Sequence, residues 1–159
     1  MSRLTFTQWL QQSTAHLPED LIQTLKITAD CCRDISAAIA RGALTGVLGQ
    51  AGSENVQGED QKKLDVISND MLLAAHANGG HLAGMASEEM DDPFPVTTHA
   101  SSRYLLLFDP LDGSSNIDIN APVGTIFSVL ETVPGSNTAE VAPFLQAGTA
   151  QVAAGYAIY

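Results

Sequence analysis

The chain has few basic side chains. Its 159 residues include 7 Lys and Arg against 18 Asp and Glu, which gives a formal net charge of −11. Nucleic acids and anionic membranes are polyanions, and the proteins that bind them cluster Lys and Arg. Here the one dense basic group is the pair Lys62 and Lys63. We therefore expect no nucleic-acid and no membrane partner, and any anionic partner needs a cation between it and the acidic protein.

Long apolar runs and paired cysteines are also missing. No run approaches the roughly 18 apolar residues of a membrane span. The first residues lack the apolar core of a secretory signal, so we expect a cytoplasmic location. Cys31 and Cys32 are adjacent, which excludes a long-loop disulfide and a CxxC pair between them. The four histidines follow no metal-binding spacing, and no P-loop, GxGxxG or GxSxG motif occurs.

The order of predicted elements indicates an α/β class. Helical spacing of apolar residues predicts helices over 5–13, over 18–41 and over 62–75. Apolar runs predict strands over 81–86, 104–108, 124–130 and 152–159, with an irregular excursion over 131–148. Helices followed by strands favour an α+β or layered α/β/α arrangement. Because the sequence stops inside its last predicted strand, we expect it to be the N-terminal part of a longer chain.

A glycine-rich stretch separates the long helix from the next one. Five glycines lie within residues 42–58, among Ser, Asn and Gln. Glycine at this density predicts a mobile loop. Such a loop is either a plain connector or a lid that closes over a site.

The segment from Asp109 to Ser115 carries the clearest chemical signal. A buried strand delivers Asp109 to its end, Pro110 predicts a turn, and Asp112 follows three residues later. Two carboxylates on one tight turn repel each other unless a cation lies between them. Hard oxygen ligands favour Mg²⁺, Mn²⁺ or Ca²⁺ over zinc. The small residues that follow let backbone N–H groups approach a phosphate.

Glu88 and Glu89 also follow an apolar strand. If the two strands are neighbours, Glu88, Asp109 and Asp112 converge at one sheet edge, where α/β proteins place ligands. Successive residues on extended backbone face opposite ways, so we expect only one of the two glutamates at a given ion. The combination favours a metal-assisted phosphomonoesterase. The alternative is that both acidic segments are solvated surface turns.

The chain closely resembles class 1 fructose-1,6-bisphosphatase, of the sugar-phosphatase and inositol-monophosphatase-like superfamily. Segments 62–70, 87–89, 109–118 and 123–128 carry the resemblance, which spans nearly all of the chain. Inositol monophosphatases typically continue the shared Asp-Pro-Leu/Ile-Asp-Gly with Thr-Thr-Asn, where this chain has Ser-Ser-Asn. Residues 1–159 correspond to the N-terminal half of the family's usual chain. The resemblance implies part of an α/β/α/β/α sandwich, with long helices followed by a mostly antiparallel or mixed sheet.

Site roles follow from the resemblance position by position. It implies two or more Mg²⁺ ions, replaceable by Mn²⁺, on the side chains of Glu88, Glu89, Asp109 and Asp112 and the carbonyl of Leu111. It implies that Asp112, Gly113, Ser114 and Ser115 hold the 1-phosphate of the sugar. Asp65, paired with Glu89, would help to take the proton from the attacking water. Glu59 would act from the mobile loop 42–60, at a position where the family usually has Asp, and the loop becomes a lid.

The implied activity is hydrolysis of D-fructose 1,6-bisphosphate to fructose 6-phosphate, in gluconeogenesis or the Calvin cycle, by a homotetramer. Sedoheptulose 1,7-bisphosphatase is an alternative. Another is a non-catalytic metal- and phosphate-binding fragment, because the second half should supply a further acidic ligand and basic residues. We therefore expect no substantial activity from residues 1–159 alone. Residues 17–22 lack the glycines and hydroxyls of AMP-inhibited members, which predicts weak or altered AMP inhibition.

Overall fold

The computed structural model describes residues 3–13, 16–41, 50–54, 60–96, 102–119, 121–133 and 135–159. Within these residues no helix is long and apolar enough to cross a membrane. In chain order the helices and strands are α1 (Phe6–Ser13), α2 (Glu19–Arg41), β1 (Gln50–Glu54), β2 (Asp60–Lys62), α3 (Lys63–Ala77), β3 (Leu82–Ser87), β4 (Phe94–Pro95), β5 (Tyr104–Asp112), β6 (Gly124–Glu131) and β7 (Ala153–Ile158). Three 3₁₀ helices, η2 (Ser114–Ile119), η3 (Ala142–Phe144) and η4 (Gly148–Ala150), lie between the last strands.

The main sheet has five strands in the order β4-β3-β5-β6-β7. Strands β3 and β5 are parallel, and every other neighbouring pair is antiparallel. Strands β1 and β2 form a separate two-stranded antiparallel sheet. The helices precede a mixed sheet, as the sequence predicts.

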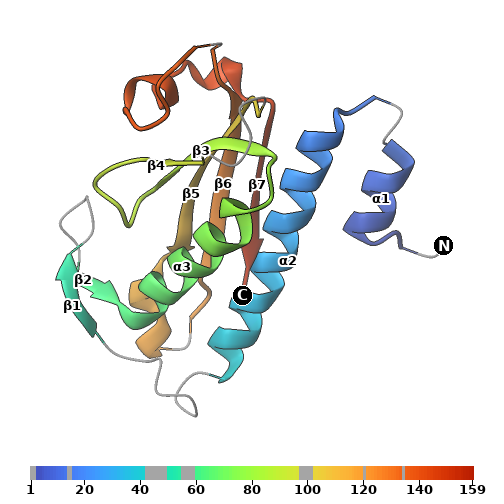
Figure 1. Cartoon of the computed structure of the whole chain (residues 1–159). Helices are drawn as coiled ribbons and strands as arrows, with labels where there is room; N and C mark the ends of the chain where they lie inside the picture. The colour runs from blue at the N-terminus through green and yellow to red at the C-terminus, as the bar shows by residue number, and fades with distance from the viewer. Residues whose placement is uncertain are drawn as a thin grey trace.

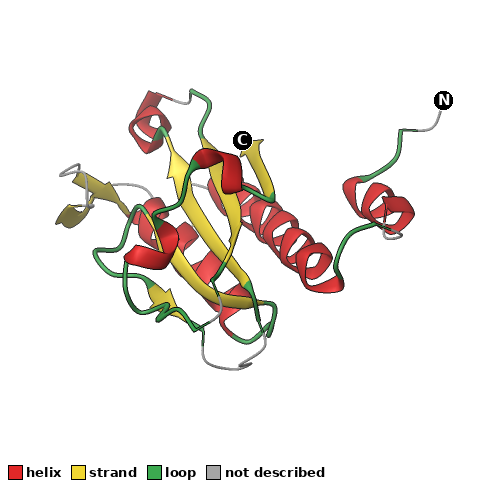
Figure 2. Cartoon of the chain, turned by 90° about the horizontal axis from the view of Figure 1, so that it is seen from above, coloured by secondary structure: helices red, strands yellow, loops and turns green. Residues whose placement is uncertain are grey.

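Helices α2 and α3 cover one face of the main sheet (Figures 1 and 2). Glu19 and Asp20 lie in the first turn of α2, where the helix dipole favours negative charge. Ile35 of α2 and Leu72 of α3 are fully buried in the main core cluster, together with residues of β3, β5 and β6. Truncating such a side chain typically costs about 2–5 kcal/mol. Helix α1 lies beside the N-terminal half of α2, away from the sheet (Figures 1 and 2).

The other face of the sheet is only partly covered. Phe144 of η3 packs on Leu105 and Leu130 in a second, smaller cluster. Beyond this cluster, Ile126 of β6 is 46% exposed and Tyr156 of β7 is 73% exposed. In β7 exposure alternates residue by residue, so one side of this strand is covered and the other is open.

Three details differ from the sequence predictions. Strand β5 continues to Asp112, whereas a turn at Pro110 was expected; a β-bulge against β6 accommodates the proline, which has no N–H for the ladder. Strand β4, only two residues long, was not predicted. Part of the expected loop 42–60 is strand β1. Residues 42–49 and 55–59 lie outside the described residues, so a lid in this stretch stays a prediction.

Candidate active site

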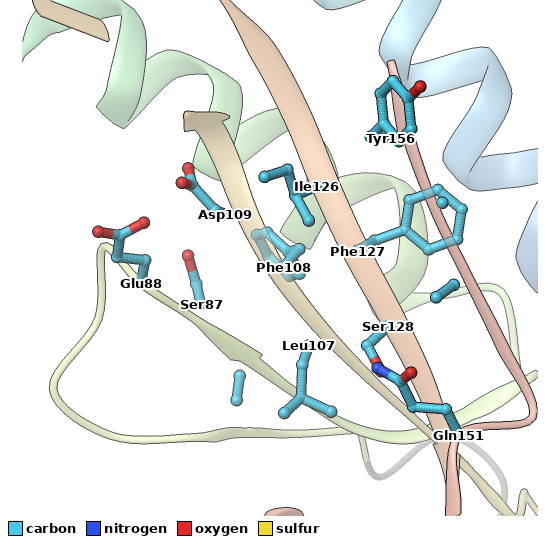
Figure 3. Close-up of a pocket in the computed structure, with 13 residues that line it drawn as sticks. Ser87, Glu88, Leu107, Phe108, Asp109, Ile126, Phe127, Ser128, Gln151 and Tyr156 are labelled. Carbon is cyan, nitrogen blue, oxygen red and sulfur yellow. The ribbon is translucent and has the colours of Figure 1, made fainter. Parts of the chain in front are cut away.

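Glu88 and Asp109 meet at the carboxyl ends of the two parallel strands. Ser87 pairs with Phe108 in the β3–β5 register, and the Glu88 N–H donates to the Phe108 carbonyl oxygen at 3.1 Å. The next residue of each strand is therefore brought to the same edge. Figure 3 shows the two carboxyl groups pointing into one space beside the end of β5. The strand-end arrangement expected from the sequence is present for this pair.

The two carboxyl groups are close enough to share a hydrogen bond. Burial raises the pKa of Asp109 to about 7, and the contact with Glu88 adds to the rise. The Leu111 N–H donates to Asp109 Oδ1 at 3.0 Å, and this hydrogen bond lowers the pKa of Asp109. Two carboxylates in contact need a proton or a cation between them. The negative charge of the Glu88–Asp109 pair therefore attracts a cation.

A β-bulge connects Asp109 to Asp112. Asp109 pairs with Ile126 and Asp112 with Gly124, so β5 has one residue more than β6 over this interval. In a regular strand two residues three positions apart face opposite sides, and one inserted residue restores a common side. The charge of Asp112, an exposed residue, raises the pKa of Asp109. Gly113 then takes φ +74°, a conformation that favours glycine.

Asp65 approaches the same region from the first turn of α3. Its Oδ2 accepts from the Lys62 N–H at 2.6 Å and from Ser114 Oγ at 3.1 Å. The side chain is 2% exposed, and its Oδ1 has no hydrogen-bond partner in the structure. Burial raises the pKa of Asp65, the two donors lower it, and the charge of Asp109 raises it further. A buried carboxylate with one free oxygen beside other acids can accept a proton.

A salt bridge also holds η2 against the start of α3. Lys62 Nζ lies 2.8 Å from Asp118 Oδ2, which joins the start of α3 to η2. Neither Lys62 nor Asp118 has an individual role among the residues predicted from the sequence. The spacing of Lys62 and Asp65 offers a signal for the local contact, because a helix-capping acid belongs three residues after the cap. No local spacing indicates the contact with Asp118.

Two of the remaining predicted residues, Glu89 and Ser115, belong to the described part of the chain. Glu89 is half-buried in the turn after β3, and its N–H donates to Ser87 Oγ at 3.2 Å. Its predicted pairing with Asp65 stays a prediction. Ser115 is exposed on η2, whereas the Ser114 hydroxyl is bonded to Asp65. Glu59 lies outside the described residues.

These donors fit a hard divalent cation. Glu88, Asp109 and Asp112 offer carboxylate oxygens, which Mg²⁺ and Mn²⁺ prefer to softer ligands. The free Asp65 Oδ1 is a further oxygen, on a side chain within electrostatic range of Asp109. Across the described part of the chain, no group of three or more His, Cys, Asp or Glu side chains is gathered into a metal-ligand set. The close pair is therefore Glu88 and Asp109, with Asp112 and Asp65 at a longer electrostatic range.

Fold and site together define an α/β domain that gathers acids at the carboxyl end of its parallel strands. Residues 2–159 match the family model described as the N-terminal domain of fructose-1,6-bisphosphatase. The chain belongs to the fructose-1,6-bisphosphatase family.

Two solved structures from Leishmania major are similar over almost all of the chain. The fructose-1,6-bisphosphatase in its holo form is 32% identical with a TM-score of 0.88, and the match covers 100% of this chain and 50% of that one. The apo form is 29% identical with a TM-score of 0.78, covering 99% of this chain and 47% of that one. The chain thus spans about half the length of these relatives.

Proposed function

We propose that this chain is the N-terminal half of a Mg²⁺-dependent fructose-1,6-bisphosphatase that removes the 1-phosphate of D-fructose 1,6-bisphosphate. One observation supports this most: the parallel strands β3 and β5 bring Glu88 against Asp109, beside a bulge that leads into Asp112 and the small residues of η2. Family membership supports the substrate class.

Each group of residues has a distinct task in this proposal. Glu88, Glu89, Asp109 and Asp112 hold Mg²⁺, with the Leu111 carbonyl as a further ligand. When bound, Mg²⁺ neutralises phosphate charge and assists attack by water on phosphorus. Gly113, Ser114 and Ser115 offer N–H and hydroxyl donors to the 1-phosphate. Asp65, held through its Oδ2, takes the proton of the attacking water with help from Glu89.

A second unit is needed to complete this site. The open face of β5, β6 and β7 carries a hollow of about 750 Å³ that reaches from Tyr156 to Glu88 and Asp109 (Figure 3). The matched relatives are about twice as long as this chain. We propose that the second half of the fold covers this apolar face and adds ligands to the acids at its end. The non-catalytic metal- and phosphate-binding fragment remains the second candidate, favoured by the half-length match.

The test is phosphate release from fructose 1,6-bisphosphate by two preparations, residues 1–159 and the product of the complete reading frame. We expect Mg²⁺-dependent release from a product that continues into a second half and none from residues 1–159. Asp112→Ala should abolish release, and Asp92→Ala, at an exposed acid outside the site, should leave it unchanged. Equal activity of both variants, or no release from the longer product, would contradict the proposal.

Further assignments rest on this activity. We propose a homotetramer in the cytoplasm, acting in gluconeogenesis or the Calvin cycle, as the family resemblance implies. Sedoheptulose 1,7-bisphosphate also presents a 1-phosphate on a ketose. The same assay with both sugars measures the preference.

A further inference from the structure

The bulge between Asp109 and Asp112 is held by a side chain of the neighbouring strand. The β5–β6 register skips Pro110 and Leu111, so these residues stand outside the regular pairing. Thr125 Oγ1 donates to the Pro110 carbonyl oxygen at 2.8 Å. Both residues are buried, and Thr125 is 0% exposed. The hydroxyl therefore supplies the bulge carbonyl with a hydrogen bond at a buried position.

A second hydroxyl fixes the direction of the first. Thr125 Oγ1 lies 2.7 Å from the Tyr159 hydroxyl oxygen. The threonine hydroxyl has one proton, and when it gives this proton to Pro110, Tyr159 O–H is the donor to Thr125 Oγ1. The Tyr159 hydroxyl also contacts Cys32. Burial raises the pKa of Tyr159, which keeps this phenol protonated and able to donate. The Tyr159 N–H also donates to the Val123 carbonyl oxygen at 2.8 Å, which anchors the residue beside β6.

We infer that Thr125 and Tyr159 are positioning residues for the predicted metal ligands Asp109 and Asp112. Their hydroxyls form a directed chain, Tyr159 O–H to Thr125 O–H to Pro110 C=O, that ends between the two acids. These two hydrogen bonds hold the inserted residue of the bulge in place. Without it, the bulge can relax toward a register in which Asp109 and Asp112 face different sides. This inference rests on the proposed function, because it assigns the bulge to metal binding.

The first test uses metal-free residues 1–159 and amide hydrogen exchange measured by NMR. Thr125→Val keeps the side-chain shape but removes the donor, and Thr125→Ser restores it. We expect Thr125→Val to speed exchange at the Leu111 amide, which bonds Asp109, by about tenfold or more beyond any change in α2 amides. Thr125→Ser should exchange as the wild type does. Uniform acceleration that includes α2, or equal exchange in both variants, would contradict local positioning.

Tyr159→Phe is a milder variant that leaves the aromatic ring and removes the phenol donor. It should speed exchange at the same Leu111 amide by a smaller factor than Thr125→Val. This variant keeps the test decisive even where Thr125→Val fails to fold. An unchanged exchange rate of the Leu111 amide in Tyr159→Phe would show that the tyrosine hydroxyl does not help to hold the bulge.

The second test measures the Mn²⁺ affinity of the product of the complete reading frame by electron paramagnetic resonance. Removing a residue that orients a metal ligand typically weakens metal binding by about 10- to 100-fold. We expect this loss in Thr125→Val and affinity within about threefold of the wild type in Thr125→Ser. Wild-type protein that binds no Mn²⁺ contradicts the proposed function. Wild-type protein that binds Mn²⁺ with the same affinity as Thr125→Val contradicts the positioning role.

Discussion

The carboxyl group of Asp109 is in hydrogen-bond contact with that of Glu88. The electrostatic energy of this contact is unfavourable when both groups are ionised. A cation bound between the two carboxylates makes it favourable. Such residues are retained for binding at a cost to the stability of the free protein. The consequence is measurable as a difference between metal-free and metal-loaded protein.

Asp109→Asn should stabilise the metal-free chain at pH 8 and abolish its stabilisation by metal. The amide removes the repulsion with Glu88 and also removes a charged ligand. Metal at about 100 times its dissociation constant stabilises by about 2.7 kcal/mol, or roughly 5–10 °C in Tm for a domain of this size. Thermal unfolding followed by circular dichroism in EDTA and in MgCl₂ measures both effects. A variant that keeps the Mg²⁺-dependent rise in Tm would show that Asp109 is not a ligand.

His76 makes stability depend on pH independently of the site. Its side chain is 1% exposed, and its Nε2 lies 3.1 Å from Thr28 Oγ1 on α2. Thr28 gives its proton to the Thr24 carbonyl oxygen, so the histidine is the donor. Burial lowers the pKa of His76 from 6.5 to about 4, and the charge of His81 adds to the fall. The folded protein therefore holds this imidazole neutral.

Below pH 6.5 the unfolded chain takes up a proton at His76, and the folded protein does so only near pH 4. The stability contribution is present above pH 6.5 and is lost as pH falls toward 4. Between pH 7 and pH 5 we expect a loss of about 2 kcal/mol in the free energy of unfolding that is absent in His76→Gln. Urea unfolding of both proteins at the two pH values isolates this contribution. An equal pH dependence in both proteins would contradict the assignment.

At the scale of elements, β6 is the strand on which the site geometry depends. It pairs with the bulged part of β5 on one side and with β7 on the other. Gly124, which begins β6, faces Asp112 on one strand and Ile158 on the other. A side chain there would push these strands apart.

Gly124→Ala should therefore destabilise the protein by about 1–3 kcal/mol. A methyl group at Gly124 would lie 2.5 Å from the Ala157 carbonyl oxygen, whereas one at Gly148 meets nothing within 4 Å. Gly148→Ala is the matched control, with an expected change within about 0.5 kcal/mol. Denaturant unfolding measures both variants. Equal stability of the two would mean that β6 and β7 adjust freely.

The elements that the sequence predicts well are those with a local signal. The long helix follows from apolar spacing and acids in its first turn, and the strands before Glu88 and Asp109 follow from short apolar runs. The extension of β5 through Pro110 depends on pairing with β6, which no local pattern encodes. The bond between Ser114 and Asp65 joins residues 49 positions apart and was likewise missed. The acids that meet at the strand ends thus carry a local signal, whereas the contacts that orient them do not.

At the scale of the whole molecule, one apolar sheet face is covered only in part. Ile126 is 46% exposed, Tyr156 73% and Ile158 68%. Isolated apolar residues are common on surfaces, but a contiguous patch beside a site marks an interaction surface. The patch and the length of the matched relatives support the proposal made above that the second half of the family fold covers this face.

The double variant Ile126→Lys with Tyr156→Lys should change the free energy of unfolding differently in residues 1–159 and in a longer protein that includes the second half. In residues 1–159 Ile126 is about half exposed and Tyr156 is largely exposed, so the free energy of unfolding of the double variant should lie within about 1 kcal/mol of the wild type. In a product of the complete reading frame that includes a second half, the same change buries two charges and should cost several kcal/mol. Leu145→Lys, at a 77% exposed residue outside the hollow, is the control. A double variant as stable as the control in the longer protein would place the second half elsewhere.

The measurement that tests the central claim most directly is ³¹P NMR of fructose 1,6-bisphosphate with the product of the complete reading frame. With Mg²⁺ present we predict that the 1-phosphate signal disappears, inorganic phosphate appears, and the 6-phosphate signal persists. Removal of Mg²⁺ with EDTA should stop the reaction, and Asp112→Ala should not support it. Loss of the 6-phosphate, or hydrolysis that continues in EDTA, would contradict the account.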